Sequence, residues 1–287
     1  MTRTDPPRIA PEWLNDPAIC AVMAALASAR PLFVGGCVRD ALLGRTASDV
    51  DVCVTSPPDR TMAMLSAAGL RAEPTGVDHG TVTAISGGRG IEVTTLRRDV
   101  ATDGRRAVVA FTDDPAEDAA RRDFTMNALY AGPDGVVLDP LGGLQDLRAG
   151  RVRFIGDAHA RIAEDFLRVL RFFRFTAWFG RAGVDADGLR ACAAHAQELR
   201  RLSRERIGRE MRRLLAAPDP GPAVAAMADA GVLAPVAAGA DPSILPALVA
   251  AERASLARLK IASEAQTDGV PLNEGGDGQA LLQARID

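Results

Sequence analysis

Several residue types that support common protein chemistry are scarce in this chain. Histidine occurs only three times in 287 residues, at scattered positions, which argues against a zinc site. The four cysteines are also scattered and include no CxxC pair, a pattern typical of reduced, mostly buried thiols in a cytoplasmic protein. Lysine occurs once, as Lys260, so arginine provides almost all of the positive charge.

Long apolar runs are absent as well. No window approaches the roughly 18 unbroken apolar residues that span a membrane, and the N-terminal stretch MTRTDPPRIAPEW lacks the apolar core of a signal peptide. We therefore expect no membrane partner and a cytoplasmic location. Hydrophobic residues nevertheless make up 47% of the chain. That content allows one large or two modest domains with hydrophobic cores.

The net charge of −3 at pH 7 would by itself argue against a nucleic-acid partner. The charges are unevenly distributed, however. Residues 151–213 contain 15 Arg and 8 Asp and Glu, a balance of +7, whereas residues 1–150 and 214–287 each have a balance of −5. A basic segment between two acidic ones is typical of a protein that binds a phosphate-bearing partner.

Residues 1–150 have the mixed pattern of strands and helices. We expect helices at 18–30, 37–44 and 60–69, and strands at 31–36, 49–56, 80–86 and 90–97. This order predicts a mixed sheet with helices packed on it. The polar, Asp-rich residues 99–120 predict a mobile loop, followed by a helix over 121–131 and a strand over 135–143.

Only helical patterns follow residue 150, at 160–180, 185–202 and 203–217. The fold class is therefore α+β, with a domain boundary near residue 150. The last stretch, residues 267–287, is polar and Gly-rich, which predicts a loosely ordered tail.

Asp49 and Asp51 lie in the segment SDVDVCV, which otherwise has the pattern of a buried strand. Residues i and i+2 of a strand point to the same face, so we expect the two carboxylates to project side by side. Divalent cations, most simply Mg²⁺, would relieve their repulsion, and paired ions of this kind assist phosphoryl or nucleotidyl transfer. The DxD pattern alone could equally be a polar strand edge with two solvated acids.

Gly35 and Gly36 lie between an expected strand and an expected helix, where backbone N–H groups can bind a phosphate. Arg39, one turn inside that helix, could reach a triphosphate. For the glycines alone, an ordinary turn beside a surface arginine is the simpler explanation. Their occurrence together with the DxD pattern, all within residues 35–51, favours a phosphate-binding site.

This region resembles the signature of class II tRNA nucleotidyltransferases and bacterial poly(A) polymerases, within the DNA polymerase β superfamily. The likeness covers residues 30–215 and is carried, in order, by GGCVRDALLG (35–44), SDVDV (48–52), HGTVTA (79–84), IEVTTLR (91–97), RRDFTMNALY (121–130), DPLGGLQDL (139–147), RFIGDAHARIAEDFLRVLRFFRF (153–175) and ERIGREMRRLL (205–215). It implies a polymerase-β-like nucleotidyltransferase head at 1–150. An all-helical neck at 151–215 would recognise the base and bind RNA, and residues 216–287 would form a partial helical body with its tail.

The resemblance assigns roles in nucleotide binding to RRDFTMNAL. By this likeness Arg122 contacts phosphate, Asp123 the ribose hydroxyls, and Asn127 the sugar or a phosphate. Asp123 could instead cap a helix, and the two roles are compatible.

The segment EDFLR carries a second assignment, that of selecting the base. Asp165 and Arg168 are three residues apart and would be neighbours on a helix. A carboxylate accepts and a guanidinium donates hydrogen bonds, so the pair would match cytosine and adenine and reject guanine and uracil. In isolation the two residues could form a surface ion pair. Arg171 shares their helix face and would contact the triphosphate or position Arg168.

Other features are less specific. Glu92 is a possible auxiliary metal ligand, and residues 99–118 correspond to a flexible loop of the family that is thought to help the pocket change from CTP to ATP. No HxxxH or HD pair is present, so we expect no phosphohydrolase domain. The region after residue 215 does not resemble a complete body domain, which puts tight tRNA binding in doubt.

The resulting hypothesis is a template-independent nucleotidyltransferase that adds C, C and A to the 3′ end of tRNA. It would use CTP and ATP, two Mg²⁺ ions at Asp49 and Asp51, and release pyrophosphate. Poly(A) polymerases and CC- or A-only adding enzymes share these motifs and stay open as alternatives. A small-molecule nucleotidyltransferase or a noncatalytic RNA-binding remnant is a more distant possibility. The sequence does not indicate an oligomeric state.

Overall fold

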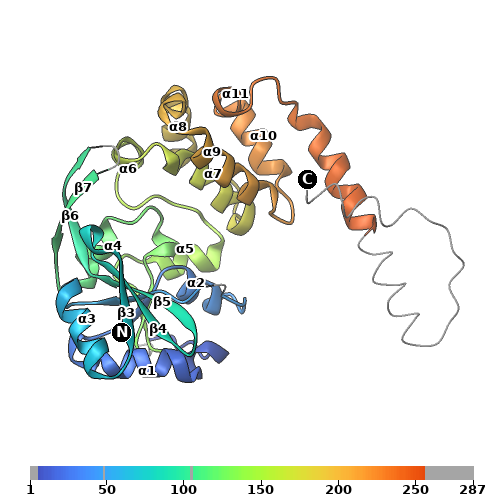
Figure 1. Ribbon diagram of the computed structural model, residues 1–287. Coiled ribbons are helices and arrows are strands. Elements are labelled where there is room, and N and C mark those ends of the chain that lie inside the picture. The colour runs from blue at the N-terminus through green and yellow to red at the C-terminus, as the bar shows by residue number, and fades with distance from the viewer. Residues whose placement is uncertain (1–5, 48, 104–105, 256–287) are drawn as a thin grey trace, which may run out of the picture.

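The computed structural model describes residues 6–47, 49–103 and 106–255, and within them the head is built on a seven-stranded sheet (Figure 1). Its strands are β1 (Leu32–Val34), β2 (Val52–Val54), β3 (Arg71–Gly76), β4 (Thr81–Ser86), β5 (Arg89–Thr95), β8 (Tyr130–Ala131) and β9 (Val137–Leu138). Their spatial order is β3-β4-β5-β2-β1-β8-β9. Strands β2 and β5 are parallel and the other neighbours antiparallel, so the predicted mixed sheet is confirmed.

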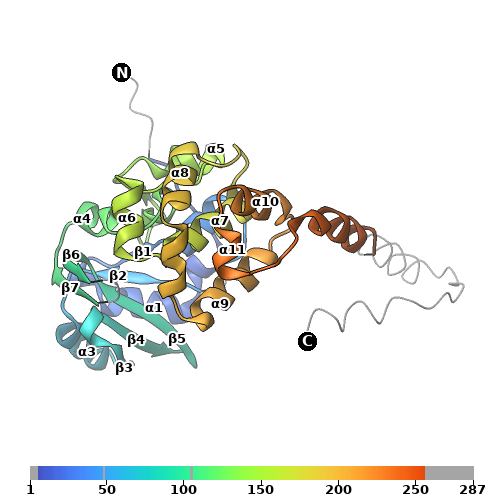
Figure 2. The same ribbon diagram turned by 90° about the horizontal axis from the view of Figure 1, so that it is seen from above.

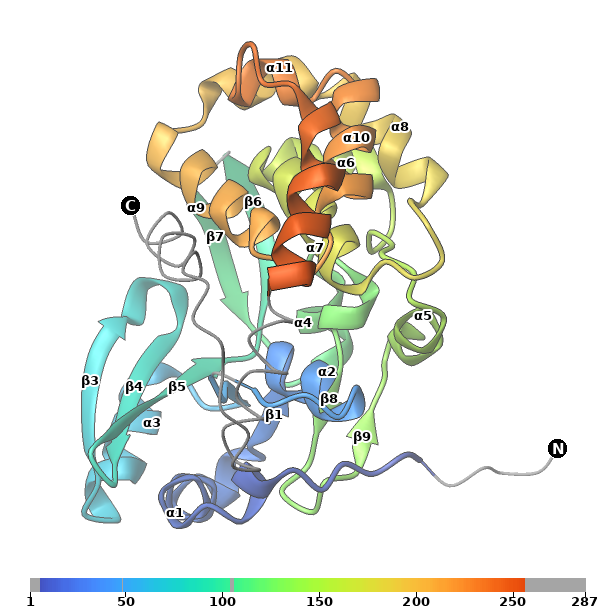
Figure 3. The ribbon, with the colours of Figure 1, turned by 90° about the vertical axis from the view of Figure 1, so that its right-hand side faces the viewer.

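The helices of the head are α1 (Pro17–Ala25), α2 (Gly36–Leu42), α3 (Pro58–Ala67), α4 (Pro115–Ala120) and α5 (Gly143–Ala149). Helix α1 begins where Pro17 follows Asp16, whose carboxylate accepts the Ala18 N–H at 2.8 Å. Helices α1 and α3 lie on the side of the sheet away from the helices that follow residue 150 (Figures 1 and 3).

The prediction of a mobile loop over residues 99–120 is wrong for its described part. Strands β6 (Arg97–Asp103) and β7 (Arg106–Phe111) form an antiparallel pair, and α4 follows. The β-branched pair Val108 and Val109 favours a strand. The Asp114 carboxylate accepts the Ala116 N–H at 2.8 Å and caps α4.

The helix predicted over residues 121–131 is also wrong. Only a single 3₁₀ turn, η4 (Thr125–Asn127), forms there, and β8 follows directly. Phe124 has an extended backbone and pairs with Phe154 in an isolated antiparallel bridge. This pairing stops a helix from forming across the motif.

The second part of the chain is helical, as predicted (Figure 2). It contains α6 (Ala158–Glu164), α7 (Leu167–Phe179), α8 (Ala186–Ala194), the 3₁₀ segment η5 (Ala196–Arg201), α9 (Arg204–Leu215), α10 (Gly221–Asp229) and α11 (Leu233–Val236). In the described residues no helix has the length and apolar character of a membrane span. The predicted loose tail, residues 267–287, lies outside the described residues.

The helix predicted over residues 160–180 is interrupted. Asp165 has an extended backbone, with φ −152° and ψ 108°, so α6 ends at Glu164 and α7 starts at Leu167. The Asp165 carboxylate accepts the Leu167 N–H at 3.1 Å, which stabilises the start of α7. Asp165 and Arg168 therefore do not share one continuous helix.

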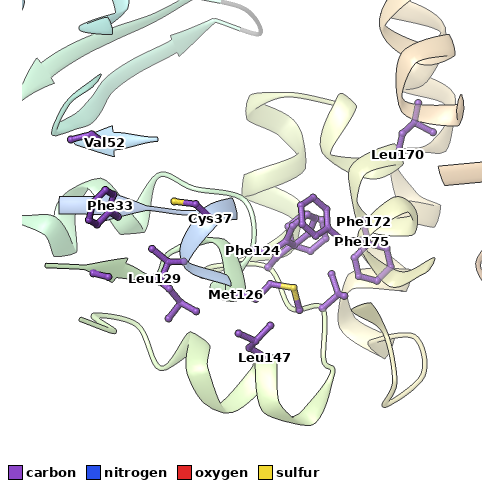
Figure 4. Close-up of a cluster of buried hydrophobic side chains, with 14 of the residues drawn as sticks. Phe33, Cys37, Val52, Phe124, Met126, Leu129, Leu147, Leu170, Phe172 and Phe175 are labelled. Atoms are coloured by element: carbon purple, nitrogen blue, oxygen red, sulfur yellow. The ribbon is translucent and has the colours of Figure 1, made fainter. Parts of the chain in front are cut away.

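One hydrophobic core connects the sheet to the helices. Figure 4 shows it running from Phe33 and Val52 in the strands, past Phe124, to Phe172 and Phe175 of α7. The Phe124 ring lies 4.9 Å from that of Phe154 and 5.1 Å from that of Phe175. Because Phe124 directly follows Asp123, this packing fixes Asp123 at the junction between head and neck.

Candidate active site

Three carboxylates lie near the start of β2. Only Val52–Val54 form the strand, so the prediction that both aspartates are strand residues is wrong, and Asp51 directly precedes β2. The pairing of Val52 with Val93 places Asp51 beside Glu92 of β5. Burial raises the pKa of Asp51, and the negative charges of Glu92 and then Asp49 raise it further. Asp49 and Asp51 thus lie just before β2, and Glu92 of the neighbouring strand adds a third negative charge.

These three acids would supply part of the ligands of a bound cation. No three His, Cys, Asp or Glu side chains in the described ranges are arranged to enclose a metal ion. Mg²⁺ commonly takes only one or two carboxylates and completes its shell with water and substrate phosphate oxygens. The mutual repulsion at Asp51 would fall when a cation binds, so the residues fit such an ion.

Arg122 also interacts with Asp51, and its positive charge opposes the rise in the pKa of that carboxyl. Its guanidinium donates to the Asp118 carboxylate, with Nε–Oδ2 and Nη2–Oδ2 distances of 3.1 and 3.0 Å. Asp118 is fully buried and also accepts from Arg121 and from the Tyr130 hydroxyl, at 2.6 and 2.7 Å. Burial alone would lower the pKa of Arg122, but the pairing with Asp118 raises it above its usual range. Arg122 is thus a fixed positive charge beside the carboxylates.

Sequence reasoning missed Asp118. A signal was available, because Asp118 precedes Arg121 by three residues and Arg122 by four, the spacing of ion pairs on a helix. Residues 99–120 were predicted to form a loop, in which the ion-pair spacing of a helix has no meaning.

Gly35 packs against the same arginine. A Cβ atom at Gly35 would lie 3.4 Å from Arg122 Nη1, and the backbone there has φ +75°, a conformation that favours glycine. The Gly35 N–H already donates to the Leu129 carbonyl at 2.9 Å, so this N–H is not the phosphate donor that the pattern suggested. Gly36 starts α2 and has Arg39 Nη2 beside it. The glycines therefore allow two arginines to approach the turn closely.

A continuous chain of polar contacts joins four predicted residues across head and neck. Arg39 Nη1 donates to Asn127 Oδ1 at 2.7 Å, and Asn127 Nδ2 donates to Asp123 Oδ1 at 3.0 Å. Asp123 Oδ2 in turn accepts from Arg171 Nε at 2.7 Å. Asp123 is buried, yet Arg171 and Asn127 lower the pKa of its carboxyl. Arg39 is also paired with Asp40, at 2.9 Å, so it does not extend freely toward solvent.

Three arginines surround the ring of Phe175 on α7. Their guanidinium carbons lie 4.4 Å (Arg174), 5.3 Å (Arg39) and 5.4 Å (Arg171) from the ring centroid. Cation–π contacts of this kind stabilise arginines that would otherwise repel one another. Arg174 also pairs with the buried carboxylate of Glu210 at 2.6 Å. Phe175 therefore helps to gather positive charge next to Asp123.

Asp165 and Arg168 have separate partners. Asp165 Oδ2 accepts from Arg206 of α9 at 2.8 Å, whereas Arg168 Nη1 donates to Glu164 at 2.6 Å. Both residues are only partly buried. The helix-face ion pair considered from the sequence is thus absent between these two residues. Asp165 is close enough to Arg171 for its charge to raise the pKa of Arg171, which places it beside the polar chain described above.

The arrangement combines an acidic group at Asp51 with fixed positive charge from Arg39, Arg122 and Arg171. Such a site can bind a polyphosphate and a cation together. Two cavities of about 400 and 410 Å³ lie around Thr55 and Asp113, at the other end of β2, and do not include these residues.

Comparison with known proteins bears on the same regions. Residues 32–153 match the family model described as the poly(A) polymerase head domain, and residues 184–244 match that of a probable RNA- and SrmB-binding site of polymerase A. The head of this chain belongs to the poly(A) polymerase head-domain family. These matches, and the similarity to a solved structure given below, confirm the resemblance and the α+β fold class inferred from the motifs.

Named relatives and solved structures are similar to this chain over the head and neck. Human mitochondrial CCA tRNA nucleotidyltransferase 1 is 43% identical over 187 residues, 63% of this chain and 42% of the relative. The CCA-adding enzyme of Streptococcus pyogenes serotype M2 is 42% identical over 188 residues, 65% of this chain and 46% of the relative. The Bacillus stearothermophilus CCA-adding enzyme, solved with CTP, has a TM-score of 0.70 at 32% identity, covering 80% of this chain and 57% of that structure. The matches thus span less than half of either curated relative.

Proposed function

We propose that this protein is a template-independent RNA nucleotidyltransferase that adds CMP and AMP to the 3′ end of tRNA. CTP and ATP would be the substrates and pyrophosphate the second product. The observation that carries the proposal is the polar chain from Arg39 through Asn127 and Asp123 to Arg171, because it joins the acidic head to the helix that follows Asp165. The names of the similar proteins, CCA-adding enzymes among them, support the same substrates.

The head would bind the triphosphate. Arg122, fixed by Asp118, and Arg39 and Arg171, gathered around Phe175, supply the positive charge for its oxygens. The Asp123 carboxylate accepts from the Phe124 N–H, from Asn127 and from Arg171, so a ribose hydroxyl would take the place of one of these donors. These contacts would orient the α-phosphate toward the carboxylates.

Asp49 and Asp51 would hold the divalent cation that the family implies. We propose two Mg²⁺ ions, with Glu92 as an auxiliary ligand. When bound, they would neutralise charge on the α-phosphate and on the attacking 3′ hydroxyl. The two aspartates would position the cation, and the partial burial of Asp51 would limit competing water.

Base selection would use Asp165 and Arg168. Each has a partner that orients it: Arg206 for the carboxylate and Glu164 for the guanidinium. A carboxylate accepts up to about four hydrogen bonds and a guanidinium donates five, so both keep capacity for a base edge. Cytosine and adenine offer an amino donor beside a ring-nitrogen acceptor, which is the complementary pattern.

The domain assignment follows from these roles. We propose a catalytic head at 1–150, a neck at 151–215 for base recognition and RNA binding, and a partial helical body at 216–287, in a cytoplasmic enzyme. The arginine content of residues 151–213 supports RNA contact by the neck.

Pyrophosphate release tests the reaction class. A tRNA transcript ending at its discriminator base is incubated with Mg²⁺ and each nucleoside triphosphate in turn. CTP alone should give pyrophosphate only when tRNA is present, and UTP and GTP should give little. Release of pyrophosphate with a small-molecule acceptor instead of RNA, or no release with any nucleotide, would contradict the proposal.

A further inference from the structure

An exposed cluster of rings lies on the neck next to Asp165. It consists of His159 on α6, Phe166 in the break between α6 and α7, His195 at the end of α8, and Arg201 at the end of η5. The ring of His195 lies 5.5 Å from that of His159 and 6.0 Å from that of Phe166. The guanidinium carbon of Arg201 lies 5.2 Å from the centroid of Phe166. We call these four residues the neck ring cluster.

The neck ring cluster lies at the edge of the hydrophobic core, against which Phe166 packs. His159 is exposed, His195 and Phe166 are half-buried, and the Arg201 side chain is 70% exposed. Core aromatic residues on the adjacent helix, such as Phe172 and Phe173, are fully buried. The rings and the guanidinium plane of the cluster therefore keep surface available to a flat ligand.

A metal does not explain the two histidines. No set of three potential His, Cys, Asp or Glu ligands occurs in the described part of the chain. The His195 ring instead lies against that of His159, at an interplanar angle of 58°, and against that of Phe166, at 37°.

The charge around the cluster favours an anionic partner. The cluster lies within residues 151–213, where arginines outnumber acids by 15 to 8. Proteins that bind single-stranded RNA combine a basic surface with aromatic side chains and arginine planes on which unpaired bases stack. Phe166 directly follows Asp165, so a base on the cluster would be next to the residue proposed to select the incoming nucleotide.

We propose that the neck ring cluster is a stacking subsite for an unpaired base near the 3′ end of the RNA substrate. This inference rests on the proposed function and adds the residues that contact the RNA. The ligand it takes is a single-stranded ribonucleotide, whereas a base-paired stretch would not present a free ring face.

Binding of a fluorescent single-stranded RNA and of the same RNA annealed to its complement, without nucleoside triphosphates, tests the proposal on the full chain. Phe166→Leu keeps the apolar bulk but removes the ring, and His159→Ala changes an exposed position where folding is not at risk. Each should weaken single-strand binding by at least about fivefold, the size of one lost base–aromatic stack. Binding of the duplex should stay unchanged, and Phe166→Tyr should restore single-strand affinity.

Arg201 has a matched control. Arg190 is 69% exposed and pairs with Asp187 three residues earlier, just as Arg201 pairs with Glu198. Arg201→Ala should therefore weaken single-strand binding more than Arg190→Ala, although both remove one positive charge from the neck.

Three results would overturn the proposal: unchanged single-strand binding in Phe166→Leu and His159→Ala, an equal loss with the duplex, or equal effects of Arg201→Ala and Arg190→Ala. Absence of RNA binding by the unaltered chain would contradict both this proposal and the proposed function. RNA binding by the unaltered chain, together with no pyrophosphate release from any nucleotide in the separate transfer assay, would contradict the proposed function alone.

Discussion

Arg171 of α7 pairs with Asp123 of the head through two contacts to the same carboxylate oxygen, at 2.7 Å from Nε and 2.5 Å from Nη2. Asp123 is buried and follows the helix that carries Asp118, whereas Arg171 lies one helical turn beyond Arg168. This ion pair therefore ties the residues proposed to bind the sugar and phosphates to those proposed to select the base.

Removing Arg171 should destabilise the protein, because the buried Asp123 carboxylate would lose its main partner. We expect Arg171→Ala to lower the free energy of unfolding by about 3 kcal/mol, measured by urea denaturation at pH 7. Arg171 keeps the pKa of Asp123 below its unfolded value of about 3.9, so this stabilisation exists above that pH and is lost as the pH falls. The variant should accordingly show a smaller loss of stability between pH 5 and 3 than the unaltered chain. Equal acid sensitivity in both proteins would contradict the assigned pairing.

Neutralising Asp51 should increase the stability of the protein and abolish its activity. The pKa of Asp51 is raised in the folded protein, so its ionisation reduces stability as the pH rises above the unfolded value of about 3.9. We expect Asp51→Asn to raise Tm at pH 7.5, with the difference disappearing near pH 3, while nucleotide transfer is abolished. Asp59→Asn, at an exposed position on α3, is the control and should change neither property. A lower Tm for Asp51→Asn would show that repulsion from Glu92 and Asp49 is not the dominant effect.

Asp118 should act on nucleotide binding through Arg122. Asp118→Asn keeps the side-chain size but weakens the contacts to the guanidinium, so we expect KM for CTP to rise about tenfold, on the scale of one lost hydrogen bond to a charged group. The value of kcat should change much less, because Asp118 does not contact the reacting atoms. Asp113→Asn removes an exposed acid that pairs with Arg30 and is the matched control. A fall in kcat with unchanged KM would contradict a positioning role.

Base choice should depend on Asp165. We expect Asp165→Ala to let UTP or GTP compete, lowering the preference for CTP by about tenfold or more because an acceptor for the amino group is lost. The ratio of kcat/KM values for CTP and UTP on one tRNA transcript measures this preference. An unchanged ratio would contradict the proposal that the Asp165 and Arg168 side chains select the base.

Motif order was sufficient to predict the family, the mixed sheet and the helical neck. The local structure of the motifs was harder to predict. Periodicity extends a helix through Asp165, but the hydrogen bond from the Leu167 N–H to the Asp165 carboxylate competes with the helix and breaks it. Likewise, the bridge between Phe124 and Phe154 depends on residues 30 positions apart, which no short window contains.

Side-chain partners were the least predictable part of the candidate site. From the sequence, Asp165 and Arg168 were expected to be neighbours on one helix. In the fold, Asp165 pairs instead with Arg206 of α9. Phe175 has the pattern of an ordinary core residue, and only the approach of Arg39 from α2 gives its ring a second role.

The central claim concerns what is added to RNA. Gel analysis of a tRNA transcript ending at its discriminator base, incubated with CTP, ATP and Mg²⁺, tests it at single-nucleotide resolution. The account predicts growth by C, C and A followed by arrest, and no growth with Asp51→Asn. Long A tails would assign the chain to poly(A) synthesis, and a product that stays at its starting length would contradict the proposed transfer.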